Sequence, residues 1–492
     1  MSEPEPTPTL LLAIAIGVFC ALMLGLALWA RSRIHDEEDF IVAGRRLPLP
    51  LASATILATW FGAGTLLVAA DAVRDRGLRV SILEPFGAGV CLFLAAAFFA
   101  RRLWEARLLT VIDLFRRKWG RSVEVLASVY EVGYFVWVAT QFVSLGGIIH
   151  LFFGIDLTLS IVLVAGFLLL YTLAGGMWSV AITDFAQVVL LAIGLIILTG
   201  TLLSDVGAGS VLGGAEVLVR KSNHEHLVFV PMDRLEEFVG WMNLFVVGAI
   251  GNLYSQDLIQ RIFASRSARV AVTACVSAGV LYIVLGMMPV VLGLAGSVVL
   301  GDDVTGSVIP ALAAKFLSPT MSVVFVLTLM SAVMSSVDSG LLAPASVMAQ
   351  NLLKPMLGER VGALNLVRWC VAFVTLCSVG FAVSGQGAFE LLQRSYSVGI
   401  PPLVVMCFAV YGDDDHPLPA LLTLGLGLFL WLGEIVLAVV ASDTAALLSD
   451  LPIPIPLVLL MASVTVYTGT LILVRRERAH AQIRAQAVAE TG

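Results

Sequence analysis

The sequence predicts an all-helical polytopic membrane protein built around an inverted repeat of five plus five helices. Its composition is 59 % apolar and 13 % charged, with a mean hydropathy of +0.97, which excludes an ordinary soluble protein with a polar surface. Apolar runs of about 20 residues, long enough to cross a bilayer, recur along the whole chain. Two of these runs are interrupted by glycines and polar residues, five spans apart, as an inverted repeat requires.

The apolar runs number thirteen, and we expect each to be a membrane span: 9–30, 47–70, 79–100, 123–153, 157–177, 182–203, 237–260, 270–298, 319–350, 364–385, 393–411, 418–440 and 453–474. The first run follows the acidic segment MSEPEPTPT rather than a basic one. We therefore expect it to remain as a span with its N-terminus outside, which places the C-terminus in the cytoplasm. Of the 29 Lys and Arg residues, 21 then lie inside, in agreement with the positive-inside rule.

The second and seventh spans carry the interruptions. Residues 57–65 read LATWFGAGT and residues 247–256 read VGAIGNLYSQ. Broken helices survive at membrane depth where they line a cavity inside the protein, and in transporters such breaks hold substrate and ions. The alternative is that these glycines only allow helices to pack closely.

The repeat divides the chain into five parts. We expect an N-terminal helix and cytoplasmic loop at 1–46, a first repeat at 47–203, and an extracellular loop at 204–236. A second repeat at 237–411 and two C-terminal helices with a cytoplasmic tail at 412–492 complete the chain.

The segment SAVMSSVDSGLL at 331–342 places several oxygen atoms within one apolar span. On a helix, the Ala332 carbonyl and the Ser335 and Ser336 hydroxyls converge on one side. Such hard oxygen ligands suit a sodium ion, with further carbonyls supplied by the break around Ala58 and Phe61. Alternatively, each serine bonds back to a carbonyl one turn earlier. Asp338, a carboxylate within a span, favours a functional role.

Four motifs resemble the solute:sodium symporter family of sodium-coupled proline, sugar, monocarboxylate and choline carriers. They are DFIVAGRRLPLPLASATILATW (39–60), GGMWSVAITDFAQVVLLAIGLIIL (175–198), QDLIQRIFASRS (256–267) and AVMSSVDSGLLAPASVMAQNLL (332–353). The resemblance implies the LeuT-type fold. It also implies a sodium site made by the Ala58, Phe61 and Ala332 carbonyls and the Ser335 and Ser336 hydroxyls.

Two carboxylates could take part in ion movement. Asp184, in AITDFAQ, matches the aspartate that the family places near the inward path of the ion or at a second ion site. A structural carboxylate at a helix N-terminus is the alternative. Asp338 is either a ligand of a second cation or a hydrogen-bond acceptor between packed helices.

Different residues of the chain resemble family members with different substrates. Glu84 resembles the pocket glutamate of the sugar carriers, but Gly248 stands where those carriers have an asparagine, which argues against a sugar. Trp60 and Trp137 fit the tryptophan box of choline carriers, and Ser255 lies near the position of a third tryptophan. Aromatic faces bind cations, although tryptophans in spans are more often packing residues. The full expected substrate set is Trp60, Gly62, Thr65, Glu84, Trp137, Gly248, Gly251 and Ser255.

We therefore expect a sodium-coupled symporter of the cell membrane that imports a small organic cation or zwitterion by alternating access. We expect sodium as the coupling ion, a monomer or weak homo-oligomer, and no nucleic-acid partner. A proton-coupled carrier using Asp184 or Asp338 remains an alternative, as does a carrier for a monocarboxylate or another uncharged or anionic solute. An enzyme is not expected, because no nucleophile and base pair or metal-ligand cluster appears in the spans.

Overall fold

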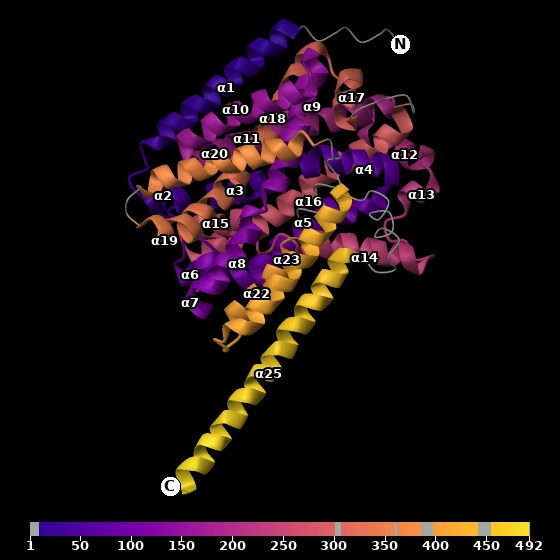
Figure 1. Cartoon of the computed structure of the whole chain (residues 1–492). Coiled ribbons are helices and arrows are strands. Elements are labelled where there is room, and N and C mark those ends of the chain that lie inside the picture. Colours follow the sequence, from indigo (N-terminus) through magenta and orange to yellow (C-terminus); the bar gives the residue numbers. More distant parts are fainter. Residues whose placement is uncertain are drawn as a thin grey trace.

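The computed structural model describes residues 9–300, 307–358, 362–384, 396, 398–440 and 454–491. Within these residues the chain is helical almost throughout, and its single β contact is an isolated bridge between Leu47 and Ser265. Figure 1 shows one bundle of helices, from which the C-terminal half of α25 (Ile455–Thr491) projects as a long rod. The prediction of an all-helical fold is confirmed.

The helices follow one another in this order: α1 (Thr9–Arg31), α2 (Glu37–Val42), α3 (Leu49–Trp60), α4 (Ala69–Arg76), α5 (Ala88–Leu94), α6 (Ala100–Ala106), α7 (Ile112–Trp119), α8 (Arg121–Val132), α9 (Phe135–Phe153), α10 (Leu157–Gly175), α11 (Met177–Val206), α12 (Val211–Lys221), α13 (His224–Leu227), α14 (Leu235–Ile250), α15 (Gln256–Ala264), α16 (Ala268–Val299), α17 (Val308–Phe316), α18 (Pro319–Val347), α19 (Lys354–Leu357), α20 (Ala363–Ala382), α22 (Ile400–Tyr411), α23 (Pro417–Val440) and α25. Tighter or wider helical segments join some of them: η1 (Ala43–Arg45), η2 (Gly64–Val68), η3 (Leu78–Ile82), η4 (Leu83–Gly87), η5 (Ala95–Phe99) and η6 (Met348–Leu353).

The described residues allow a partial count of the thirteen expected spans. In the described ranges, eight helical segments are long and apolar enough to cross a bilayer, and the bent pair α3 and η2–α4 makes nine. Shorter apolar helices occupy 157–173, 400–411 and 417–433. The count of thirteen is therefore not confirmed, and part of the expected span 393–411 lies outside the described residues.

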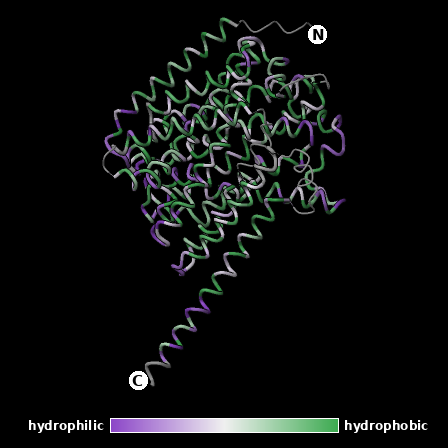
Figure 2. Tube along the Cα trace, viewed as in Figure 1, coloured by the Kyte–Doolittle hydropathy of each residue, from purple (hydrophilic) through white to green (hydrophobic). Residues whose placement is uncertain are grey.

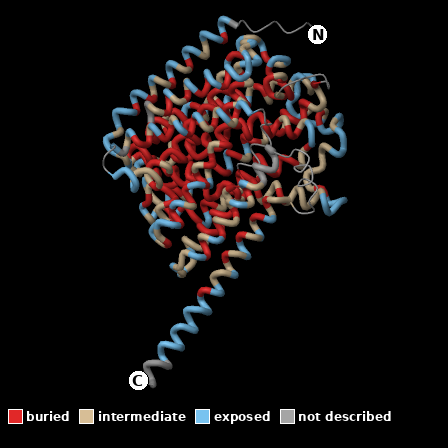
Figure 3. Tube along the Cα trace, in the orientation of Figure 1, coloured by how far each residue is buried: buried red, intermediate tan, exposed pale blue. Residues whose placement is uncertain are grey.

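Burial sorts the helices into an outer and an inner group. Figure 2 shows apolar residues over most of the bundle, and Figure 3 shows buried residues concentrated in its centre. On α1 the apolar side chains of Leu10, Ile14 and Leu22 are exposed, as expected for a helix that faces lipid. On α18, by contrast, every residue from Thr328 to Val347 is buried. Helix α18 therefore runs through the protein interior, where it packs against α3, α9 and α11.

Both expected interruptions are present. The second span ends its first helix at Trp60 and resumes at Gly64, with a bend of 59° between the two halves. The seventh span ends α14 at Ile250 and begins α15 at Gln256. The sequence analysis did not foresee a third irregularity at Glu84, whose backbone is extended (φ −136°, ψ 122°) within a helical segment. Pro85 follows it, and a residue before proline is pushed out of the helical region.

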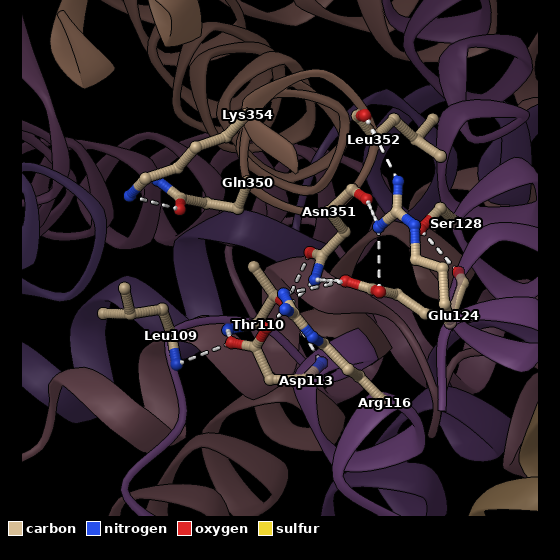
Figure 4. Close-up of polar contacts among 11 residues, drawn as sticks. Leu109, Thr110, Asp113, Arg116, Glu124, Ser128, Gln350, Asn351, Leu352 and Lys354 are labelled. Carbon is tan, nitrogen blue, oxygen red and sulfur yellow. Dashed lines mark hydrogen bonds and ion pairs between the residues drawn. The ribbon is translucent and has the colours of Figure 1, made fainter. Parts of the chain in front are cut away.

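The cytoplasmic end expected for α18 is joined to α7 and α8 by a polar network. Figure 4 shows the Asn351 side chain between Thr110, Asp113 and Glu124. The Asn351 amide donates to Asp113 at 2.9 Å and to Glu124 at 3.0 Å, and its oxygen accepts from Thr110 at 2.8 Å. Arg121 forms an ion pair of 2.8 Å with the buried Glu124. We call these five residues the α8–η6 network.

Two details of the expected topology change in the structure. The segment 204–236 is not a plain loop, because it contains α12 and α13. Arg261, one of the 21 basic residues expected inside, is fully buried within α15. It therefore belongs to the protein interior and does not contribute to the positive-inside bias.

Candidate sodium and substrate site

The break after α3 frees a carbonyl oxygen. In a continuous helix the Ala58 carbonyl would accept from the Gly62 amide. That amide instead donates to the Trp60 carbonyl at 2.9 Å, and the next amide, of Ala63, donates to the Gln141 side chain at 2.8 Å. The Ala58 oxygen is thereby left for partners outside its own helix.

Those partners are the two serines of α18. The Ser335 and Ser336 hydroxyls each lie 3.1 Å from the Ala58 oxygen. They also donate to the Ala332 carbonyl one turn earlier, at 2.8 and 3.3 Å, so the alternative of serines that bond back along their own helix is present as well. Four of the five expected sodium ligands are thus brought together across the α3–α18 contact. To hold a cation, the two hydroxyls would turn their hydrogens away and present lone pairs beside the two carbonyls.

For Phe61, the fifth expected ligand, the described contacts involve the ring and not the carbonyl. The ring packs edge-on against Tyr282 with centroids 5.4 Å apart. No hydrogen bond among the described residues places the Phe61 carbonyl with the other four oxygens.

Gly62 is required by close packing at the same break. A Cβ at this position would lie 2.4 Å from Ser336 Oγ and 2.7 Å from Gln141 Oε1. Gln141 of α9, which the sequence analysis did not single out, therefore supports the break in two ways. It accepts from the freed Ala63 amide and lies against Gly62.

Asp184 of α11 and Asp338 of α18 belong to a buried polar group next to the serine pair. Thr55 donates to Asp184 Oδ2 at 2.5 Å, and the Ser339 amide donates to Asp338 Oδ1 at 2.8 Å. The second oxygen of each carboxylate is buried without a hydrogen-bond partner among the described residues. Asp184 occupies the third turn of α11, so the alternative of a carboxylate at the helix N-terminus is wrong.

Arg261 was missed as a member of this group. Its guanidinium donates to the Ser339 hydroxyl and, at 2.8 Å, to the Asp257 carbonyl. Ser339 in turn donates to the Ser335 carbonyl at 2.9 Å. A chain of hydrogen bonds therefore connects the buried cation to the serine pair. The motif QDLIQRIFASRS contains Arg261, but a count of basic residues near the span ends does not distinguish a buried guanidinium from a loop residue.

Glu84 lies at the centre of a second polar group, in which its carboxylate accepts hydrogen bonds from three residues. Its Oε2 accepts from Tyr282 at 2.7 Å and from Thr65 at 3.0 Å, and its Oε1 accepts from Tyr396 at 2.8 Å. Tyr282 also donates to the Trp60 carbonyl at 3.1 Å and shares a short contact with the Thr65 hydroxyl. The expected residues Glu84 and Thr65 are thus together beside the break, whereas Tyr282 and Tyr396 were not foreseen.

The two expected tryptophans are both buried, but no ring contact among the described residues joins them. Trp137 stacks on Tyr134 with centroids 5.1 Å apart and fills the space above Gly340, where a Cβ would lie 2.5 Å from the indole. Trp60 is 6 % exposed, and its indole nitrogen is buried without a hydrogen-bond partner in the described part of the chain.

The remaining expected residues belong to the second break. A Cβ on Gly248 would lie 2.6 Å from the Leu83 carbonyl, so α14 packs closely on η4 at this point. Gly251 and Ser255 line a small cavity between α14, α15 and α8. The glycine in place of the sugar carriers' asparagine is therefore a packing position in this chain.

Comparison with known proteins agrees with this architecture. The model of the Sodium:solute symporter family matches residues 40–411. Human high affinity choline transporter 1 is 29 % identical over 356 residues, covering 68 % of this chain and 60 % of that protein. The sodium/glucose cotransporter of Vibrio parahaemolyticus is 23 % identical over 432 residues, covering 80 % of this chain and 78 % of that protein. The matched part is between 58 % and 62 % of the choline transporters of human, Caenorhabditis elegans and Drosophila melanogaster.

Solved structures show the same fold. A substrate-bound, outward-open Na+-coupled sialic acid symporter superposes with a TM-score of 0.76 at 16 % identity, covering 94 % of this chain and 98 % of that one. A nucleobase-cation-symport-1 family transporter superposes with a TM-score of 0.60 at 15 % identity, covering 90 % and 96 %. Together with the family match, which spans well over half of the sequence, these findings place the protein: the chain belongs to the sodium:solute symporter family.

Proposed function

We propose that this protein is a sodium-coupled symporter that imports a small organic cation or zwitterion by alternating access. The observation that carries the proposal is the convergence of the Ala58 and Ala332 carbonyls with the Ser335 and Ser336 hydroxyls at the α3 break. A bound sodium ion would link α3 to α18 and so stabilise one arrangement of the core over another. The Phe61 carbonyl is proposed as a further ligand of this ion.

The energy available from sodium is sufficient for accumulation of a solute. One sodium ion that moves inward through about 100 mV releases about 2.3 kcal/mol. A tenfold concentration gradient adds about 1.4 kcal/mol. Together these terms support a substrate gradient of several hundredfold.

The proposed substrate class rests on Glu84 and the tryptophans. Glu84 supplies a buried negative charge, with hydroxyl donors but no basic partner within the described contacts. Trp60 ends α3 just before the break, and Thr65, which follows the break, contacts that carboxylate. An ammonium group would find charge from Glu84 and a π-face from Trp60 or Trp137. The choline transporters among the relatives favour the same class.

We also propose the orientation and division expected from the sequence. The N-terminus lies outside and the C-terminus in the cytoplasm. The repeats span 47–203 and 237–411 around an extracellular segment at 204–236. Asp184 and Asp338, each with one buried oxygen that has no hydrogen-bond partner among the described residues, are proposed to serve the inward path of the ion or a second cation.

A ligand screen followed by a transport assay tests the proposal. Purified protein is heated with sugars, amino acids, monocarboxylates or quaternary amines, each in sodium and in potassium. Uptake of the compounds that stabilise it is then measured in proteoliposomes under an inward sodium gradient. We expect stabilisation by choline-like amines in sodium only. Uptake driven by a pH gradient without sodium would instead establish the proton-coupled alternative.

A further inference from the structure

A surface hollow between α6 and α7 gathers basic side chains that the proposed transport sites do not use. Its volume is about 410 Å³, which lies within the range of small-molecule sites. Figure 1 shows α6 and α7 at the end of the bundle that lies away from the N-terminus. The lining consists of Arg107, Leu108, Leu109, Asp113, Arg116 and Arg117.

Asp113, the acidic residue of this lining, does not neutralise the arginines. Its Oδ2 accepts from the Leu109 and Thr110 amides at 3.2 and 3.0 Å. Its Oδ1 accepts from the Asn351 side-chain amide at 2.9 Å (Figure 4). In the described part of the chain no ion pair joins Asp113 to an arginine. The hollow therefore has three guanidinium groups and one carboxylate, whose oxygens already accept from amides.

Arg107 and Arg117 are exposed, and neither forms an ion pair within the described residues. Arg107 ends α6 in the left-handed conformation (φ 54°, ψ 46°), and its guanidinium lies over the Trp104 ring, 4.1 Å from the centroid. Arg117 donates to the Ala106 carbonyl at 3.1 Å. Because a guanidinium has five N–H donors, both side chains keep donors for a ligand in the hollow.

Arg116 shares its acidic neighbour with another arginine. It lies 3.7 Å from Glu124, whose carboxylate forms a closer ion pair of 2.8 Å with Arg121. Glu124 is fully buried and also accepts from Asn351 at 3.0 Å. One carboxylate thus serves two arginines, so positive charge remains in excess at the hollow.

Aromatic side chains indicate that the hollow lies near the membrane surface. Phe98 and Tyr411 are both exposed, and the Tyr411 hydroxyl donates to the Phe98 carbonyl. Arg102, about one turn after Phe98, lies over the Tyr411 ring, 3.9 Å from its centroid. Exposed aromatic rings next to arginines are typical of the interface between hydrocarbon and headgroups. Arg107 follows Phe98 by about two and a half helical turns, so the hollow lies at the level of the headgroups.

We propose that this hollow binds the phosphate headgroup of an anionic phospholipid, with Arg107, Arg116 and Arg117 as donors. The planar guanidinium group suits phosphate oxygens, and basic residues next to a membrane span attract anionic lipids. A soluble phosphate offers the same charge, but it makes no use of the apolar Leu108 and Leu109 or of the adjoining bilayer. The inference does not rest on sodium coupling.

The proposed lipid would act on the α8–η6 network. Asp113 lines the hollow and binds Asn351, and Arg116 lines the hollow and lies beside Glu124. A headgroup held by the three arginines would therefore stabilise the contacts of α7 with α8 and η6. We expect bound anionic lipid to raise the unfolding temperature of the protein.

Equilibrium binding of a fluorescent phosphatidylglycerol to the purified full-length protein in detergent tests the site. The competitors are unlabelled phosphatidylglycerol, phosphatidylcholine with the same acyl chains, and inorganic phosphate, all without sodium gradient or substrate. Phosphatidylglycerol should bind roughly tenfold more tightly than phosphatidylcholine, and high salt should weaken its binding because exposed charges are screened. Arg107→Gln and Arg117→Gln should each weaken it about fivefold, the contribution of one basic residue near an anionic membrane surface.

Arg101→Gln is the matched control. Arg101 is exposed on the same helix and pairs with Glu105 at 3.1 Å, outside the hollow, so this variant should bind the lipid as the unaltered protein does. Arg117→Lys keeps the charge and should retain more binding than Arg117→Gln, which separates loss of the site from loss of folding.

Three results would overturn the proposal. If Arg101→Gln loses as much affinity as Arg107→Gln, the lipid is attracted by the general charge of this surface and not by a site. Equal binding of phosphatidylglycerol and phosphatidylcholine would show that the arginines do not select the headgroup. Displacement of the lipid by an equal concentration of inorganic phosphate would show a site for a soluble anion. The proposed sodium coupling survives each of these results, because the assay measures neither sodium nor substrate.

Discussion

The hydroxyl of Tyr282 lies 2.7 Å from Oε2 of Glu84 and 3.1 Å from the carbonyl oxygen of Trp60. One side chain of α16 thus connects the proposed substrate carboxylate to the broken helix that also presents Ala58 to the sodium-site serines. Any movement of Glu84 toward a ligand must change a contact with the break. This relationship offers a physical route by which substrate and sodium binding can influence each other.

Glu84→Gln should separate substrate binding from sodium binding. The amide keeps the size of the side chain but removes the charge, so binding of a choline-like amine should weaken tenfold or more. Sodium binding measured without substrate should stay within about twofold, because the serine site has its own ligands. Isothermal titration with each ligand measures both effects. Equal loss of amine and sodium binding would show that Glu84 is only a structural support.

Ser335→Ala and Ser336→Ala should each raise the sodium concentration for half-maximal transport by tenfold or more. A hydrogen-bond-strength contact with a charged group contributes about 1.5–3 kcal/mol. Ser331→Ala is the matched control, because Ser331 is buried on the same helix and its hydroxyl has no partner among the described residues. If the sodium dependence of both variants equals that of Ser331→Ala, the assignment of the sodium site is wrong.

Asp184→Asn should affect coupling more than substrate fit. Asp184 lies in the buried group with Thr55 rather than beside Glu84, so equilibrium substrate binding should change by no more than a few fold. Sodium-driven uptake in proteoliposomes should fall, because an ion on its inward path would lose a negative charge. The role is refuted if substrate affinity collapses while the response to sodium persists.

The sequence was sufficient for the breaks but not for the contacts that surround them. Glycines beside polar residues predicted the interruptions at 57–65 and 247–256, since both features are costly in a smooth membrane helix. The polar group around Glu84 could not be predicted in the same way. Its partners Tyr282 and Tyr396 are 198 and 312 residues distant in the chain. Pro85 was the one local signal of the kink at Glu84.

Arg261 is a residue whose position the sequence pattern predicted wrongly. A charge count treats every arginine near a span end as a loop residue, whereas this guanidinium is fully buried and donates to Ser339 and to the Asp257 carbonyl. Burial of a cation depends on acceptors from distant helices, and the pattern of neighbouring residues in QDLIQRIFASRS does not reveal them.

Asn351→Ala should destabilise the protein at the α8–η6 network. The change leaves the buried Glu124 with one donor fewer and Thr110 without its acceptor, and each unsatisfied buried group costs about 1–3 kcal/mol. Thermal unfolding in detergent measures the loss. Gln350→Ala is the control, because the hydrogen bond given for the Gln350 side chain within the described residues is with Lys354, outside the network. This variant should unfold as the unaltered protein does. Equal unfolding temperatures for the two variants would show that the network does not hold η6 to α8.

The last prediction concerns the tryptophans and the charge of the substrate. Trp60 is the better of the two for a test, because its indole nitrogen has no hydrogen-bond partner within the described residues, so a change there breaks no described polar contact of the side chain. A desolvated cation–π contact contributes about 2 kcal/mol. Trp60→Ala should therefore weaken binding of a quaternary amine roughly thirtyfold, and Trp60→Phe should weaken it less, because the phenyl ring keeps part of the π-face. Competition uptake against sugars and monocarboxylates gives the comparison. If an uncharged sugar or an anionic acid competes best and Trp60→Ala leaves its binding unchanged, the substrate is not a cation. The proposal of a sodium-coupled carrier then stands, but the role of the tryptophans in binding a cation is wrong.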